Sequence, residues 1–174
     1  YIYLSVRGRI FGDVRLFDEQ GTGVRFYTNR EDTIADQEMT VELSRIGLQQ
    51  FKRVIPYMPD MDGWLGGSLH YVDSEGQMML SADVSLDNFV YQKSPLGNWT
   101  MNGVYLPGDN NAHHVDGFIT HNDREIIYMN GIYQTDETGQ ENITGELELQ
   151  HFPLWVVNPF VPDGIVNFRG DIDG

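Results

Sequence analysis

Four side chains of this sequence have the chemistry of metal ligands: His113, His114, Asp116 and His121. Imidazole nitrogens and carboxylate oxygens are groups with which proteins bind zinc. On a single strand, however, His114 and Asp116 would lie on the opposite face from His121, because successive side chains of a strand alternate between its two faces. We therefore expect a polar strand here rather than a metal site.

Carboxylates could support two further kinds of chemistry. Asp60 and Asp62 resemble the start of a calcium-binding loop, but the acidic residues and the closing glutamate that such a loop requires do not follow. Paired carboxylates could also hydrolyse a glycosidic bond. No Asp or Glu, however, stands in the apolar sequence context typical of a general acid. We predict that the protein is not an enzyme and binds no metal or cofactor; a hydrolase with acidic catalytic residues is a third interpretation.

The most regular feature of the sequence is an alternation of apolar and polar residues. In residues 78–87, every second residue is apolar and most of the others are serine or aspartate. A period of two is typical of a strand that has one apolar face. Seven residues on such faces are our candidates for the lining of a lipid groove: Leu80, Val84, Leu86, Leu147, Leu149, Phe168 and Ile172.

Most of the chain follows this pattern, and turn residues interrupt it at the spacing of hairpins. We expect the only multi-turn helix within residues 47–55, where Pro56 ends it, and an even shorter helix at residues 154–157. A change of phase predicts a bulge near Asn88. The predicted fold is mainly β, with an elongated antiparallel sheet that curls into an open apolar groove. A closed β-sandwich is the alternative, because an enclosed core requires the same alternation.

A unit of strand, apolar segment, proline turn and strand occurs twice. The sequence PYMPD at residues 56–60 matches PFVPD at residues 159–163 without a gap, and the same alignment places Gly67 on Gly170 and Leu69 on Ile172. Internal repeats are typical of extended architectures built from supersecondary units. We interpret the chain as a single excerpt of a longer, repeat-built protein, with related units near residues 39–71 and 145–174.

The composition excludes several partners. A net charge of −15 and a pI of about 4.4 disfavour nucleic acid, whose phosphates require clustered Lys and Arg, and they disfavour anionic membranes for the same reason. The absence of cysteine excludes disulfides and thiol chemistry. With 40% hydrophobic and 21% charged residues, the chain is expected to be globular rather than disordered.

The second of the two units resembles a known family. Its pattern is Leu147-x-Leu149-x-x-Phe152, then an apolar segment with NPFVP at residues 158–162, and then Gly170-x-Ile172-x-Gly174. This pattern is similar to the recurring unit of the TamB family (translocation and assembly module), which belongs to the AsmA-like proteins of diderm bacteria. The partial copy at residues 39–69 extends the resemblance.

The resemblance implies a location, a fold and a function. The parent protein would be anchored in the inner membrane and would span the periplasm, with repeats that form a curled sheet lined by apolar side chains. It would carry phospholipid acyl chains toward the outer membrane, or support the assembly of outer-membrane proteins together with a barrel protein of the BamA superfamily. The family offers no catalytic residues to transfer. The alternative function is that of a β-sandwich module that binds carbohydrate or protein on a bacterial surface.

Overall fold

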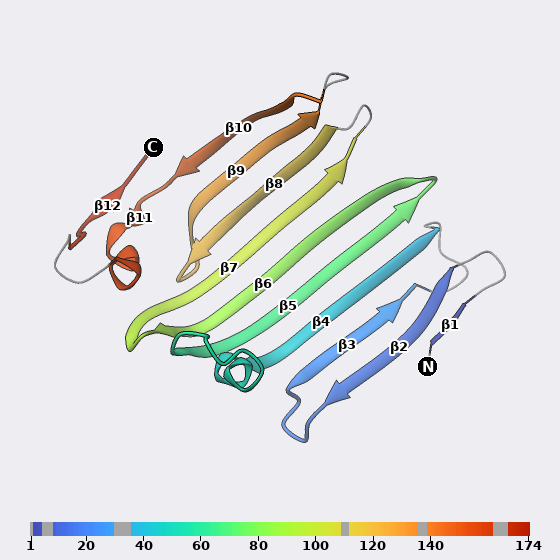
Figure 1. Ribbon diagram of the computed structural model, residues 1–174, viewed down its shortest axis with the longest axis horizontal. Coiled ribbons are helices and arrows are strands. Elements are labelled where there is room, and N and C mark those ends of the chain that lie inside the picture. Colours follow the sequence, from blue (N-terminus) through green and yellow to red (C-terminus); the bar gives the residue numbers. More distant parts are fainter. Residues whose placement is uncertain (1, 5–8, 30–35, 109–111, 136–138, 162–166) are drawn as a thin grey trace.

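The computed structural model describes residues 2–4, 9–29, 36–108, 112–135, 139–161 and 167–174. Ten antiparallel strands form one sheet, and each strand pairs with its neighbours in the sequence (Figure 1). The strands are β1 (Ile2–Leu4), β2 (Ile10–Phe17), β3 (Gly23–Thr28), β4 (Gln37–Gly47), β5 (Met61–Ser74), β6 (Gln77–Tyr91), β7 (Ser94–Pro107), β8 (Ala112–His121), β9 (Arg124–Thr135) and β10 (Glu141–Leu149).

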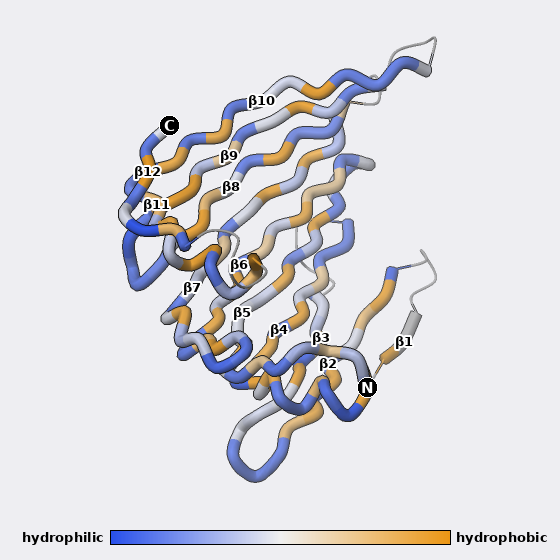
Figure 2. Tube along the Cα trace, turned by 60° about the vertical axis from the view of Figure 1, so that its left-hand side comes forward, coloured by the Kyte–Doolittle hydropathy of each residue, from blue (hydrophilic) through white to orange (hydrophobic). Residues whose placement is uncertain are grey.

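The sheet is curled and open, with β1 and β10 as its outer strands (Figure 1). A second sheet contains only β11 (Phe152–Pro153) and β12 (Asp171–Ile172), so within the described residues it is too small to cover the first. The prediction of an open antiparallel sheet is confirmed, and the described part of the chain does not form a closed sandwich. Figure 2 shows the alternation of polar and apolar residues that runs along the central strands.

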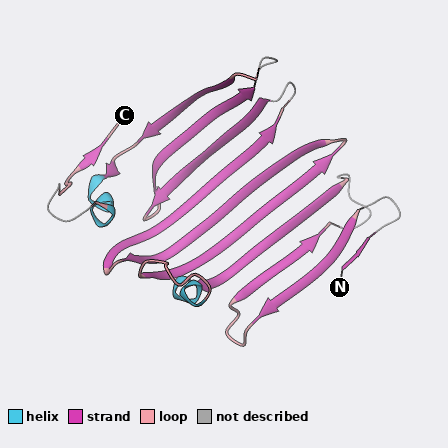
Figure 3. Cartoon of the chain, in the orientation of Figure 1, coloured by secondary structure: helices cyan, strands magenta, loops and turns pink. Residues whose placement is uncertain are grey.

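Among the residues that the structure describes, helix is confined to two short 3-10 segments, η1 (Leu48–Arg53) and η3 (Leu154–Phe160), which lie at the same end of the sheet (Figure 3). We call this the helical end, and the other the opposite end. Strand makes up 69% of the structure, which confirms the prediction of a mainly β fold. The expectation that the only multi-turn helix lies within residues 47–55 is wrong, because η3 is seven residues long and η1 only six. The tighter 3-10 form suits short connections between strands.

The bulge predicted near Asn88 is confirmed. The pairing of β6 with β7 shifts register between Leu86 and Phe89, and Asn88 has a positive φ of 52°. Further shifts occur in β4 opposite β5 and in β8 opposite β9. All of these irregularities lie toward the helical end, so the register is regular through the middle of the sheet.

The segments around η1 and η3 share a local geometry. Arg45 and His151 both have a left-handed backbone, with φ of 47° and 46°, and in each case the 3-10 helix begins three residues later. The strand before each helix then pairs with the strand that returns from it, through Ile46 and Leu65 in the first segment and Phe152 and Ile172 in the second.

The two segments can be aligned by this strand pairing or by their proline turns, and the two alignments differ. The strand pairing places Gly63, rather than Gly67, at the position of Gly170, and Gly63 and Gly170 both have a positive φ. Pro159 lies inside η3, whereas Pro56 lies beyond the end of η1. Residues 162–166, which include the end of the second proline turn, lie outside the described residues. The predicted strand around Phe168 and Ile172 is reduced to the two residues of β12.

Candidate functional site

One row of cross-strand pairs carries an apolar surface across nine strands. Directly paired residues of an antiparallel sheet project from the same face, so each pair continues the row. From β2 to β10 the row consists of Leu16, Val24, Leu43, Gly67, Val84, Met101, Ile119, Ile127 and Leu149. It contains no polar side chain, and we call the side of the sheet that carries it the apolar face.

Parallel rows widen this surface on both sides. The row next to it on one side passes through Ala82 and ends at Leu147, and the row beyond that passes through Tyr71, Leu80 and Tyr105. On the other side, a row passes through Leu65, Leu86 and Trp99. Five of the seven candidate residues therefore share the apolar face: Leu80, Val84, Leu86, Leu147 and Leu149.

The other two candidates lie outside this surface. Ile172 is on β12 and pairs with Phe152 in the small second sheet. Phe168 lies in no strand; its backbone N–H donates to the Asn158 side chain, whose amide donates back to the Phe168 carbonyl. The sequence reasoning failed here because alternation alone does not specify which sheet a short strand joins.

The apolar face is left uncovered by the described residues. Leu69, Leu80, Met101 and Val115, all on this face, are exposed although they lie in the middle of the sheet. Few apolar side chains of the described residues are buried, and most of these lie near the helical end. The buried ones are Phe11, Leu48, Leu96, Ile126 and Val156. The single sheet therefore has no enclosed core under its central rows.

The helical end of the apolar face is capped by η3. The His121 ring lies 4.7 Å from the Trp99 ring and 5.8 Å from the Trp155 ring, measured between centroids. His121 is buried, and its Nε2 lies 2.9 Å from the Leu96 carbonyl oxygen, which also accepts a hydrogen bond from Trp99 Nε1. These contacts fix one boundary of the apolar surface.

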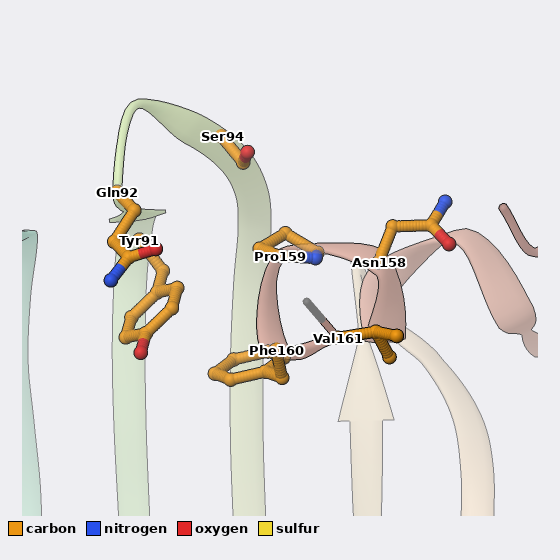
Figure 4. Close-up of a pocket in the computed structure, with 7 residues that line it drawn as sticks. All are labelled: Tyr91, Gln92, Ser94, Asn158, Pro159, Phe160 and Val161. Atoms are coloured by element: carbon orange, nitrogen blue, oxygen red, sulfur yellow. The ribbon is translucent and has the colours of Figure 1, made fainter. Parts of the chain in front are cut away.

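A cavity separates η3 from the turn between β6 and β7. Phe160 stacks on Tyr91 with ring centroids 4.4 Å apart, and Ser94, Asn158 and Pro159 complete part of the wall (Figure 4). Its volume is about 530 Å³. The cap at this end is therefore only partly filled by protein atoms.

The opposite end of the apolar face carries aromatic side chains with polar tips. Tyr105 Oη lies 2.6 Å from His113 Nδ1, and the His113 ring is 5.7 Å from that of Tyr133. Burial raises the pKa of the nearby Tyr71 phenol above its usual value, and the Asp73 carboxylate adds to this effect. Tyrosines of this kind suit a boundary between an apolar surface and water.

Two pairs of glycines interrupt the apolar face: Gly103 opposite Gly117, and Gly131 opposite Gly145. A Cβ added at Gly117 would approach the Asn102 carbonyl oxygen to 2.6 Å, and one at Gly145 would approach that of Asn130 to 2.7 Å. The strands thus come together where side chains are missing, which allows the sheet to bend. Sequence reasoning missed these pairs, although each glycine occupies a position that the alternation of its strand assigns to the apolar face.

The other face of the sheet is polar and held by ion pairs. Asp13 accepts two hydrogen bonds from the Arg15 guanidinium and two from that of Arg25, and these cations hold the pKa of Asp13 well below its usual range. Hydrogen bonds from Asn130 and Tyr128 likewise lower the pKa of Asp116. The charged residues of the strands thus gather on the side away from the apolar face.

The four side chains considered as metal ligands are divided between the two faces, as the expectation of a polar strand requires. His114 and Asp116 project from the polar face, and His113 and His121 from the apolar face. Asp60 forms an ion pair with Lys52, whose ammonium lowers the pKa of that carboxyl. In the described ranges, no three His, Asp or Glu side chains are grouped so that they could hold a metal ion. No helix in these ranges has the length and apolar character needed to cross a membrane.

The chain matches no protein-family model, no curated protein and no solved structure. The resemblance to the TamB family therefore stays a prediction that rests on the sequence pattern.

Proposed function

We propose that the apolar face holds the acyl chains of phospholipids, and that the protein is a periplasmic scaffold for phospholipid transport toward the outer membrane. In the same proposal, the chain belongs to an inner-membrane-anchored parent, which also supports outer-membrane protein assembly with a barrel protein of the BamA superfamily. The role is binding and conduction rather than catalysis. The supporting observation is the apolar row from Leu16 to Leu149, which is continuous and uncovered by the described residues.

The dimensions of the apolar face suit several extended hydrocarbon chains. The rows from Leu80 to Leu86 are six residue steps apart along the strand, or roughly 20 Å, and nine strands span roughly 38 Å at their usual spacing. Each methylene of an acyl chain that leaves water contributes about 0.8 kcal/mol. A surface of this size therefore binds a lipid tail through many weak contacts and needs no specific pocket.

The proposal is tested by photo-crosslinking in cells. A photo-reactive amino acid at position 84 or 149 of the full-length protein should form covalent adducts with phospholipid. The matched controls are positions 83 and 148, which project from the polar face one residue away. Adducts at the polar positions as well, or at none of the four, would contradict the proposal.

A further inference from the structure

A carboxylate lies on the apolar face at its opposite end. Tyr71 pairs with Leu80, and two residues further along the same two strands Asp73 pairs with Met78, so Asp73 projects from the same face as Leu80. Burial and the Asp73 carboxylate raise the pKa of Tyr71, which shows that the carboxylate and the phenol lie close together. A negative charge therefore adjoins the apolar surface at this end.

The Asp73 carboxylate is not matched by a donor among the residues that the structure describes. Its Oδ1 atom is buried and accepts no hydrogen bond from them. Arg9, which comes just before β2 at this end, is bound to Asp36, and both lysines of the chain, Lys52 and Lys93, lie at the helical end. A buried acceptor without a donor costs free energy, so a ligand that brings a positively charged donor would be stabilised here.

Two tyrosines flank the position next to Asp73. Tyr71 and Tyr105 both pair with Leu80, one on each side of it, so their Cα atoms are roughly 10 Å apart at the usual strand spacing. Leu80 between them is 40% exposed, so the two rings do not cover it. The Tyr105 hydroxyl lies 2.6 Å from His113 Nδ1 and the two rings stack, which holds the Tyr105 ring in place. A cation above Leu80 would lie within the roughly 6 Å over which an aromatic ring attracts it.

The two ends of the apolar face would place a bound lipid in one orientation. The helical end is capped by η3, where the rings of Trp99, His121 and Trp155 lie close together. An acyl chain that lies along β6 therefore has its polar headgroup at the opposite end, beyond Leu80 and beside Asp73. The groups at this end then decide which headgroup is accepted.

We propose that the opposite end of the apolar face binds the headgroup of a phospholipid that ends in a primary ammonium, as phosphatidylethanolamine does. The ammonium donates a charge-assisted hydrogen bond to Asp73 and lies between the rings of Tyr71 and Tyr105. A quaternary ammonium such as choline has no N–H with which to satisfy Asp73 Oδ1. This inference rests on the proposed function, because it assigns the headgroup of the lipid whose acyl chains the apolar face holds.

The role of the rings is tested by two substitutions of Tyr71, with the affinity for fluorescent phosphatidylethanolamine as the measurement. Tyr71→Phe keeps the aromatic ring and should bind this lipid as the wild type does. Tyr71→Leu keeps an apolar side chain without the ring and should bind it roughly threefold more weakly. Equal affinities of the two variants would contradict the placement of the ammonium between the rings.

The role of the carboxylate is tested with two lipids of equal net charge, phosphatidylethanolamine and phosphatidylcholine, which carry the same short fluorescent acyl chain. Titration with the protein gives a dissociation constant for each lipid. The wild type should bind the ethanolamine lipid about tenfold more tightly, and Asp73→Asn should remove most of this preference. The matched control is Asp83→Asn, which removes the same charge from the polar face and should preserve the preference.

The outcomes separate this inference from the proposed function. Binding of both lipids by Asp73→Asn would show that the variant is folded and that its apolar face still holds acyl chains. Equal affinities of the wild type for the two lipids, or a preference that survives Asp73→Asn, would overturn headgroup recognition and leave acyl-chain binding intact. Binding of neither lipid by the wild type would overturn both ideas.

Discussion

At the scale of single residues, the position of a charge decides whether it is tolerated. Val84 lies on the uncovered apolar face, so the carboxylate of Val84→Asp could stay hydrated, and we expect it to cost about 1 kcal/mol of unfolding free energy. Ile126 is only 1% exposed, and Ile126→Asp should cost about 3–5 kcal/mol because it buries an unpaired charge. Urea unfolding of the two variants measures this difference. Equal costs would mean that the apolar face is covered in solution.

The polar face should govern stability in acid. The pKa of Asp13 is lowered by Arg15 and Arg25, so this carboxylate stabilises the fold above its ordinary pKa, and the contribution is lost as pH falls through the lowered value. Asp13→Asn should therefore be less stable than the wild type at neutral pH, and the gap should close as pH falls toward about 2. Urea midpoints across this range give the comparison.

Asp83 provides a control on the same face. Its carboxylate has no hydrogen bond or ion pair to any residue that the structure describes, so Asp83→Asn should change the urea midpoint less at neutral pH. If the difference in urea midpoint between the wild type and Asp13→Asn did not change with pH, the substitution would act through packing and not through the carboxylate charge.

At the scale of the strands, the two glycines of a pair differ in whether they can accept a side chain. A Cβ at Gly103 would meet the Asp116 carbonyl oxygen at an ordinary 3.6 Å, whereas one at Gly117 would come within 2.6 Å of the Asn102 carbonyl oxygen. Gly103→Ala should thus stay within about 1 kcal/mol of the wild type, and Gly117→Ala should cost about 1–3 kcal/mol. Thermal unfolding distinguishes the two. Similar losses at both positions would refute the steric explanation.

Sequence reasoning predicted the strands well where the alternation is long and uninterrupted. Leu80, Val84 and Leu86 were correctly assigned to one apolar face, because a strand of the length of β6 has little freedom to change register. The bulge at Asn88 was also visible as a change of phase. The pairing that joins Val84 to Leu149 across the sheet was not predictable from either strand alone.

The ends of the strands were harder to predict. Phe168 follows an alternating pattern but is held by Asn158 rather than by a strand, and η3 exceeds the length expected for it. Val54 and Ile55 fit the helical spacing expected within residues 47–55, but η1 ends at Arg53 and both side chains are exposed. Short segments depend on tertiary contacts that a local pattern does not encode.

At the scale of the whole molecule, the uncovered face should affect behaviour in solution. Roughly 20 Å by 38 Å of apolar surface exceeds the largest patch of a typical soluble monomer, about 300–600 Å². We expect the purified protein to self-associate in plain buffer and to become monomeric in a mild detergent. Sedimentation velocity with and without detergent tests this. Val84→Asp combined with Met101→Asp should weaken the self-association, and a wild type that is monomeric without detergent would contradict the prediction.

The simple strand order has a consequence for how the chain folds. Because β1 to β10 pair only with their neighbours in the sequence, each pairing closes a short loop and loses little chain entropy. Most β-proteins must join distant strands and fold slowly for that reason, whereas folding rates rise as contacts become more local. This sheet can instead grow one hairpin at a time, so each completed hairpin provides the edge on which the next strand forms.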